Sequence, residues 1–160
     1  MEKAVQLLRV AILNEIKASA YYAQAAEVTT NDVSRMLLLE LASQEEDHAR
    51  HLIDMTRGTP LGHKFDAETY LRELEKDPEG SLSARENQAL AKADPRGVLE
   101  IAMHMEAESR DNLRAMADAV TDPALRKYCL DLSAEEQSHF SSLERALSSL
   151  DMPDEDRPAL

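Results

Sequence analysis

The sequence predicts an all-α protein, a four-helix bundle with one long crossover between the second and third helices. Apolar residues recur at helical spacing in four long stretches, while glycine and proline are sparse among the 160 residues. The connections between these stretches are short, long and short. At this length we expect one domain, with the bundle at 1–150, the crossover at 58–93 and an acidic tail at 151–160.

The first two helices are expected at about 2–28 and 32–57. Asn31 can cap the start of the second helix, and Gly58 can follow its C-cap. Only a few residues separate the two helices, so they form an antiparallel hairpin. Their inward faces are marked by Leu8, Ala11, Ile12, Ser19, Tyr22, Ala26, Leu38, Leu41, Leu52 and Met55.

The third and fourth helices each open on an Asp-Pro pair, at 94–95 and 122–123. This pair supplies an N-cap followed by proline at the first helical position. We expect the two helices to end near Val120 and Leu150 and to form a second antiparallel hairpin.

The crossover is polar and contains two expected short helices, at 66–76 and 83–93. A capping box formed by Ser83 and Glu86 opens the second of them. A connection of this length can travel from one end of the bundle to the other. The second and third long helices are therefore expected to run parallel.

The net charge of −13 argues against a nucleic acid or an anionic membrane as partner, because both are polyanions. Cys129 is the one cysteine, so no disulfide can form within the chain. The first residues carry no basic cluster and no long apolar run, so we expect no signal peptide, no membrane span and a cytoplasmic location. Helical bundles of this size commonly self-associate, and we expect a homodimer.

The two predicted hairpins align on each other without a gap at an offset of 91 residues. Such matching indicates two copies of one helical hairpin related by an approximate two-fold axis. The identical pairs include Ala11 and Ala102, Glu15 and Glu106, Arg35 and Arg126, Leu41 and Leu132, Glu45 and Glu136, His48 and His139, and Leu52 and Leu143.

The second helix carries a pair of ionisable residues on its apolar face. Glu45 and His48 are three residues apart and therefore lie one above the other, bracketed by Leu41 and Leu52. The fourth helix repeats this pattern. Both pairs are therefore expected to point into the bundle.

The first and third helices each contribute one further acid, Glu15 and Glu106. Each precedes the acid of its partner helix, Glu45 or Glu136, by 30 residues. In a tight antiparallel hairpin this spacing places all these acids at a similar height. Together with His48 and His139, they form six candidate metal ligands.

The energetics of burial favour a metal site over an empty polar cluster. One unpaired carboxylate in a helical core costs several kcal/mol or takes up a proton. No lysine or arginine is expected to point inward at that height, whereas two divalent cations would balance four carboxylates. Carboxylate and imidazole ligands suit iron(II) and manganese(II), and zinc remains open. Two iron ions are the expected cofactor.

Several other residues are expected to have lesser roles. His51 is either an outer partner of the site or solvated, and Tyr22 either donates a hydrogen bond to a carboxylate or packs in the core. His104 is expected on the exposed face, His63 in the crossover, and Cys129 in the core. Met36, Met55, Met105 and Met116 are interpreted as core residues rather than ligands.

The chain resembles the ferritin-like superfamily and, within it, the rubrerythrin-like branch. The resemblance covers all four long helices, about residues 1–150. It implies that Glu45 and Glu136 bridge two irons, that Glu15 and His48 hold one, and that Glu106 and His139 hold the other. Four segments carry it, Leu13-Asn14-Glu15-Ile16 with Tyr22, Ser43-Gln44-Glu45-Glu46-Asp47-His48, Met105-Glu106-Ala107-Glu108-Ser109 and Ala134-Glu135-Glu136-Gln137-Ser138-His139.

The chain departs from that family in two places. Rubrerythrins carry an extra carboxylate one turn after the helix-three Glu, where this chain has Ser109. They also commonly carry a rubredoxin domain, whose four-cysteine centre cannot form with Cys129 alone. The resemblance therefore implies an external electron donor, and it does not imply an iron that changes ligand with its redox state.

Three functions follow as hypotheses. The first is a di-iron oxidoreductase that reduces a small oxidant, hydrogen peroxide or dioxygen, with electrons from an external donor. The alternative is an iron-binding, storage or ferroxidase protein without peroxidase turnover. The third is a helical adaptor without a metal. The resemblance favours the first of these.

Overall fold

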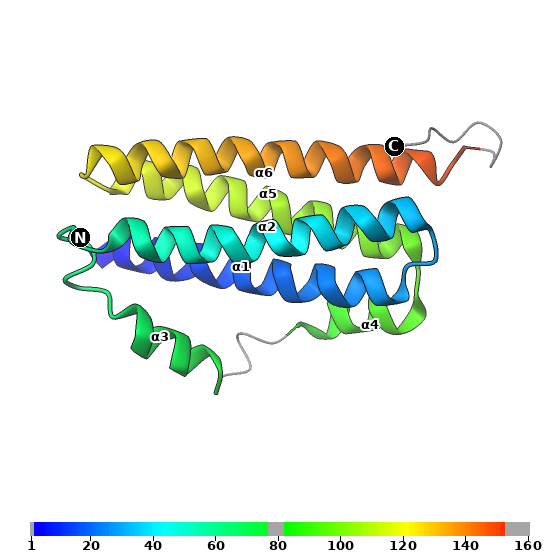
Figure 1. Cartoon of the computed structure of the whole chain (residues 1–160), viewed down its shortest axis with the longest axis horizontal. Helices are drawn as coiled ribbons and strands as arrows, with labels where there is room; N and C mark the ends of the chain where they lie inside the picture. The colour runs from blue at the N-terminus through cyan, green and yellow to red at the C-terminus, as the bar shows by residue number, and fades with distance from the viewer. Residues whose placement is uncertain (1, 77–81, 153–160) are drawn as a thin grey trace.

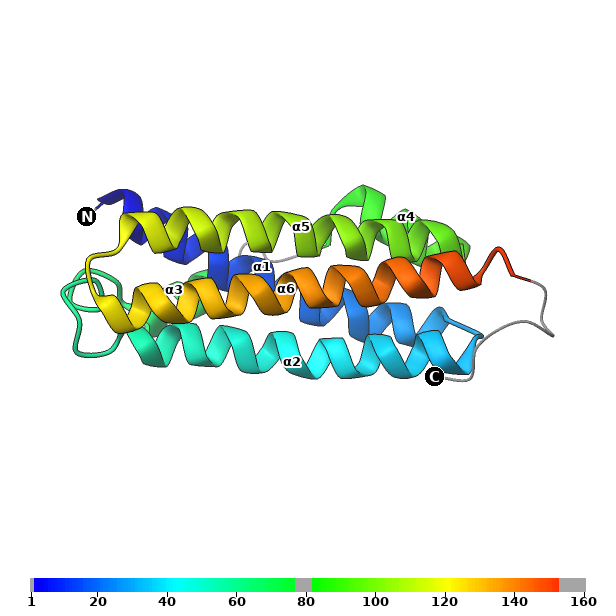
Figure 2. The same cartoon turned by 90° about the horizontal axis from the view of Figure 1, so that it is seen from above.

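The computed structural model describes residues 2–76 and 82–152. These residues form helices and no strands. The helices are α1 (Glu2–Val28), α2 (Asp32–Thr56), α3 (Ala67–Leu74), α4 (Ala84–Lys92), α5 (Pro95–Ala119) and α6 (Pro123–Ser149). The four long helices run side by side along the longest axis of the molecule (Figures 1 and 2).

The chain order confirms the predicted bundle with one long crossover. Helices α1 and α2 form one antiparallel hairpin, and α5 and α6 form the other (Figure 1). Helices α3 and α4 of the crossover lie outside the four long helices (Figure 1), and Tyr70 of α3 donates a hydrogen bond of 2.8 Å to the Arg9 carbonyl of α1. Because the crossover leads from the end of α2 back to the opposite end of the bundle, α2 and α5 run in the same direction (Figure 1). Most of the expected tail, and residues 77–81 of the crossover, lie outside the described residues.

The helix boundaries follow the predicted duplication. Helices α1 and α5 end at Val28 and Ala119, and α2 and α6 begin at Asp32 and Pro123, so both boundaries keep the 91-residue offset. The caps differ in detail. Asn31 and Asp122 each accept a backbone hydrogen bond at their helix start, whereas Asp94 occupies the N-cap of α5 without a side-chain bond to it. Gly58 follows α2 with φ of 76°, the left-handed conformation that glycine adopts most readily.

The apolar core consists of two clusters, one toward each end of the bundle. The first contains Leu8, Ile12, Leu113 and Leu132, among others. The second contains Tyr21, Tyr22, Leu38, Leu41, Val98 and Leu143, among others. On every long helix the predicted ligands fall between a residue of one cluster and a residue of the other. The core is therefore two apolar layers separated by one layer of ionisable side chains.

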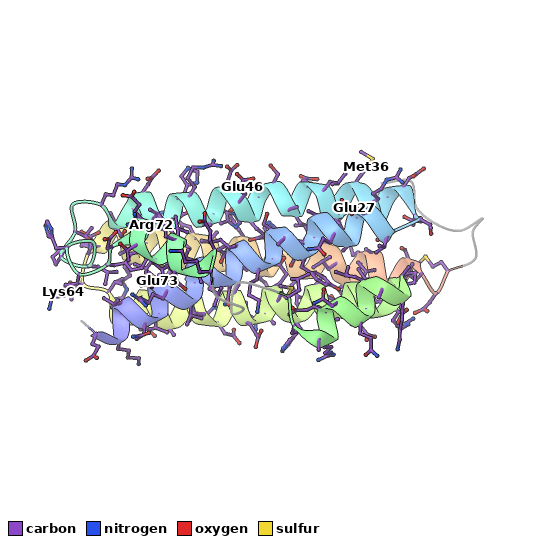
Figure 3. All side chains as sticks on the ribbon, turned by 90° about the horizontal axis from the view of Figure 1, so that it is seen from below. Glu27, Met36, Glu46, Lys64, Arg72 and Glu73 are labelled. Atoms are coloured by element: carbon purple, nitrogen blue, oxygen red, sulfur yellow. The ribbon has the colours of Figure 1, made fainter. Side chains whose placement is uncertain are left out.

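Two features of the helix faces differ from the sequence interpretation. Met36, interpreted as a core residue, is 70% exposed and projects away from α2 (Figure 3). Tyr21, which was not assigned to the core, is fully buried beside Tyr22 and donates to the Val98 carbonyl at 3.1 Å. The face of α1 that turns inward is thus wider than the predicted stripe. None of the described helices combines the length and hydropathy that a membrane-spanning segment needs.

Candidate metal centre

Four carboxylates and two imidazoles from the four long helices meet in the middle layer of the bundle. Each carboxylate is at most 1% exposed, and each imidazole residue at most 9%. The structure thus brings together all six residues predicted as ligands, which are Glu15, Glu45, His48, Glu106, Glu136 and His139.

One group of candidate ligands surrounds His48. The Nδ1 atom of His48 lies 3.0 Å from Glu45 Oε2, 3.2 Å from Glu136 Oε1 and 3.6 Å from Glu15 Oε2. One ligand atom from each of these four residues lies within 4.8 Å of the others. Three helices, α1, α2 and α6, contribute to this group.

A second group surrounds His139 in the same manner. Its Nδ1 atom lies 3.0 Å from Glu45 Oε1 and 3.6 Å from Glu106 Oε2 and Glu136 Oε2. The two groups share Glu45 and Glu136. The two imidazole rings are stacked, with centroids 5.6 Å apart and planes 11° apart. The centre thus consists of two overlapping groups of candidate ligands that have two carboxylates in common.

The two shared carboxylates are the ones that stay ionised without metal. Burial raises the pKa of Glu45, but the imidazoles of His139 and His48 have the larger, opposite effect and bring this pKa down to about 2. Burial likewise raises the pKa of Glu136, and the same two imidazoles bring it below its ordinary value. Burial lowers the pKa of each histidine, but the neighbouring carboxylates raise it more. The two shared carboxylates act together with Glu15 on His48 and with Glu106 on His139, so both pKa values lie far above the ordinary value.

The two unshared carboxylates show the opposite behaviour. Burial, followed by the Glu136 charge, raises the pKa of Glu15 well above its ordinary value. Burial also raises the pKa of Glu106, together with the neighbouring Glu136 and Glu45. These pKa shifts thus favour four protons in the metal-free centre, two on imidazoles and two on carboxyls. Two divalent cations carry the same total charge.

Unpaired buried atoms are a second observation, independent of the pKa shifts, that the six side chains fit metal ions. Several buried polar atoms of the centre make no hydrogen bond, although buried carboxylate oxygens normally have partners. Cations placed between these atoms would satisfy them and replace the four protons. The atoms are Glu15 Oε2, Glu45 Oε1, Glu106 Oε2, Glu136 Oε1, Glu136 Oε2 and His139 Nδ1.

Hydroxyl groups hold the outer oxygens of the two unshared carboxylates. Tyr22 of α1 donates to Glu106 Oε1 of α5 at 2.5 Å, and Ser109 of α5 donates to Glu15 Oε1 of α1 at 2.6 Å. Of the two interpretations of Tyr22, the structure shows the hydrogen bond. The sequence shows Ser109 one turn after Glu106, but its spacing along α5 does not predict the bond to Glu15 of another helix.

The remaining candidates belong to neither group of ligands. His51 is exposed and packs edge-on against Tyr128, with ring centroids 6.4 Å apart. His104 is exposed, as expected, and His63 is exposed in the crossover. Cys129 is a buried core residue, and burial raises its pKa to about 12, which leaves the thiol protonated and unreactive.

One residue beside the centre was not predicted. Glu135 of α6 places Oε2 3.2 Å from Nε2 of His48, the ring nitrogen that faces away from the carboxylates. Glu135 is 60% exposed, so hydrophobic patterning along α6 places it on the outer face. Only its position directly before Glu136 could have drawn attention to it.

The bundle and its middle layer define the class of the protein, a ferritin-like helical bundle with a buried carboxylate–histidine cluster that could bind metal. The comparison with protein families agrees. The family model described as Rubrerythrin matches residues 6–147, and the chain therefore belongs to the rubrerythrin family. This confirms the predicted resemblance. No curated protein and no solved structure gives a significant match.

Proposed function

We propose that the protein is a di-iron oxidoreductase that reduces hydrogen peroxide or dioxygen with electrons from an external donor. The observation that supports it most is the pair of ligand groups with two carboxylates in common. Bound as a pair, two iron(II) ions supply two electrons, the number that reduces one peroxide to two waters with two protons.

The residues divide into those that hold one ion and those that hold both. In this proposal Glu15 and His48 would hold the first ion, Glu106 and His139 would hold the second, and Glu45 and Glu136, which belong to both groups, would serve both ions. The ligands are carboxylates and imidazoles, which suit iron and manganese. A structural zinc site would usually contain cysteine ligands.

The surroundings keep this centre dry and fixed. The two apolar layers exclude water from above and below, so charges in the centre interact more strongly than they would in water. Tyr22 orients Glu106, and burial followed by the Glu106 charge raises the pKa of Tyr22 well above its ordinary value. The phenol therefore keeps its proton, and with it the hydrogen bond, at neutral pH.

Anaerobic loading with iron(II) tests the proposal. We expect two irons per chain and, in stopped-flow absorption, oxidation by hydrogen peroxide far faster than in Glu45→Ala loaded under the same conditions. Equal rates in the two proteins would exclude a reaction at this centre.

The same preparation addresses iron storage, the alternative function. Storage predicts many irons per chain and a closed shell of subunits, whereas the proposed enzyme predicts two irons and a small assembly, which we expect to be a homodimer. Iron analysis and gel filtration distinguish the two.

A further inference from the structure

The two histidines of the centre differ in what their outer ring nitrogens contact. His48 Nε2 lies 3.2 Å from the carboxylate of Glu135, which reaches across from α6 to α2. His139 Nδ1 faces carboxylates as His48 Nδ1 does. Its Nε2 atom, however, has no hydrogen-bond partner among residues 2–76 and 82–152.

The internal repeat explains this difference in terms of one residue. The position that corresponds to Glu135 in the first hairpin is occupied by Gln44, directly before Glu45. Gln44 is partly buried and lies on α2, the helix that runs beside α6 (Figure 2). The duplication therefore retains the ligands but provides an outer carboxylate for only one of the two histidines.

We propose that Glu135 is a positioning residue that orients His48 and makes the ion position of Glu15 and His48 the tighter of the two. The inference rests on the proposed function, because it takes the six residues as ligands of two ions. It extends that proposal by ranking the two positions.

The physical reason is the coupling between the two nitrogens of one imidazole. A proton kept on Nε2 by the Glu135 carboxylate leaves the lone pair of Nδ1 directed at the ion. The carboxylate also makes the ring a stronger donor, and losing such an outer partner commonly weakens metal binding about 10–100-fold. An exposed ion pair alone would contribute little to folding, so the effect of Glu135 is expected in binding rather than in stability.

Stepwise titration of the metal-free full-length protein with cobalt(II), followed by calorimetry and visible absorption, tests this ranking. The wild type should bind two ions in two distinguishable steps. In Glu135→Gln the tighter step should weaken about 10–100-fold while the weaker step stays unchanged. The thermal midpoint of the metal-free variant should match that of the wild type.

Single-position variants identify which step belongs to which half. Glu135→Gln should weaken cobalt binding in a His139→Ala background, where the His48 half remains, and should have no effect in a His48→Ala background. Equal weakening in both backgrounds, or in neither, would overturn the inference.

Gln44→Glu is the matched control that the repeat offers. It should strengthen the weaker step, and the exchange variant Glu135→Gln with Gln44→Glu should reverse the order of the two halves. A wild type that binds no cobalt would overturn both proposals. One that binds two ions unequally but is not oxidised by peroxide in its iron form would overturn the proposed reaction alone.

Discussion

The α1–α2 and α5–α6 hairpins share a backbone plan and a ligand set, yet the groups around their ligands differ. At the 91-residue offset, Tyr22 is aligned with Leu113, Ala18 with Ser109 and Gln44 with Glu135. In each pair, one hairpin has a side chain that contacts a candidate ligand, whereas the corresponding residue differs in the other hairpin. The two copies of the hairpin thus have the same candidate metal ligands but differ in the groups that contact those ligands.

Each polar group supports a ligand of the opposite hairpin. Tyr22 of the first hairpin bonds Glu106 of the second, while Ser109 of the second bonds Glu15 of the first. Glu135 of the second likewise contacts His48 of the first. Neither hairpin therefore contains a complete half-site, so the centre depends on the two hairpins being packed together.

The shared carboxylates provide the largest test of this comparison. Glu45→Ala should remove both ions after iron(II) loading and desalting, because Glu45 belongs to both groups. We expect an affinity loss above the roughly 100-fold that outer partners cause. Glu106→Ala is the control and should leave about one iron per chain. Equal iron contents in the two variants would contradict the two-group geometry.

The pH dependence of the metal-free protein is the next effect in size. His48 and His139 hold protons in the folded state far above their ordinary pKa of 6.5, and Glu15 and Glu106 do so above 4.5. Folding takes up protons in this window, so stability falls as pH rises. We expect the thermal midpoint to drop by roughly 5–10 °C between pH 6.5 and 8.

Metal loading should reverse this dependence. Cations displace the protons of the centre, so the gap between metal-loaded and metal-free midpoints should widen as pH rises over the same range. Calorimetric scans of both forms measure it. A metal-free midpoint that rises between pH 6.5 and 8 would contradict the assigned protons.

The two hydroxyls sharpen the comparison between half-sites. Tyr22→Phe should weaken the position of Glu106 about tenfold, which corresponds to roughly 1–1.5 kcal/mol for one hydrogen bond. Ser109→Ala should do the same at the position of Glu15. Tyr21→Phe is the matched control, because its phenol donates to the Val98 carbonyl, away from the ligands. Cobalt titration should show an unchanged affinity for that control.

The helix caps provide the smallest test, and it concerns folding alone. Asn31 and Asp122 occupy corresponding positions and accept backbone bonds of 2.9 and 2.8 Å. Alanine at either position should cost about 1 kcal/mol of unfolding free energy in urea. Asp122→Ala should cost a few tenths more, because its charge favours the helix N-terminus. Asp94→Ala, which removes no side-chain bond, should cost less than either.

The sequence by itself determined the helices, their duplication and the six residues that meet in the middle layer. These features depend on spacing along one helix, where the residues three and four apart share a face whatever packs against it. The observed boundaries and the burial of Glu15, Glu45 and His48 agree with that spacing.

Only the tertiary structure decided which groups touch across helices. Met36 turned outward, and Tyr21 turned inward, because the rotation of each helix against its neighbours is not encoded in its own periodicity. Ser109 and Glu135 reach their partners from different helices, at distances set by how closely the two hairpins pack. Contacts of this kind follow from packing, and spacing along one helix does not specify them.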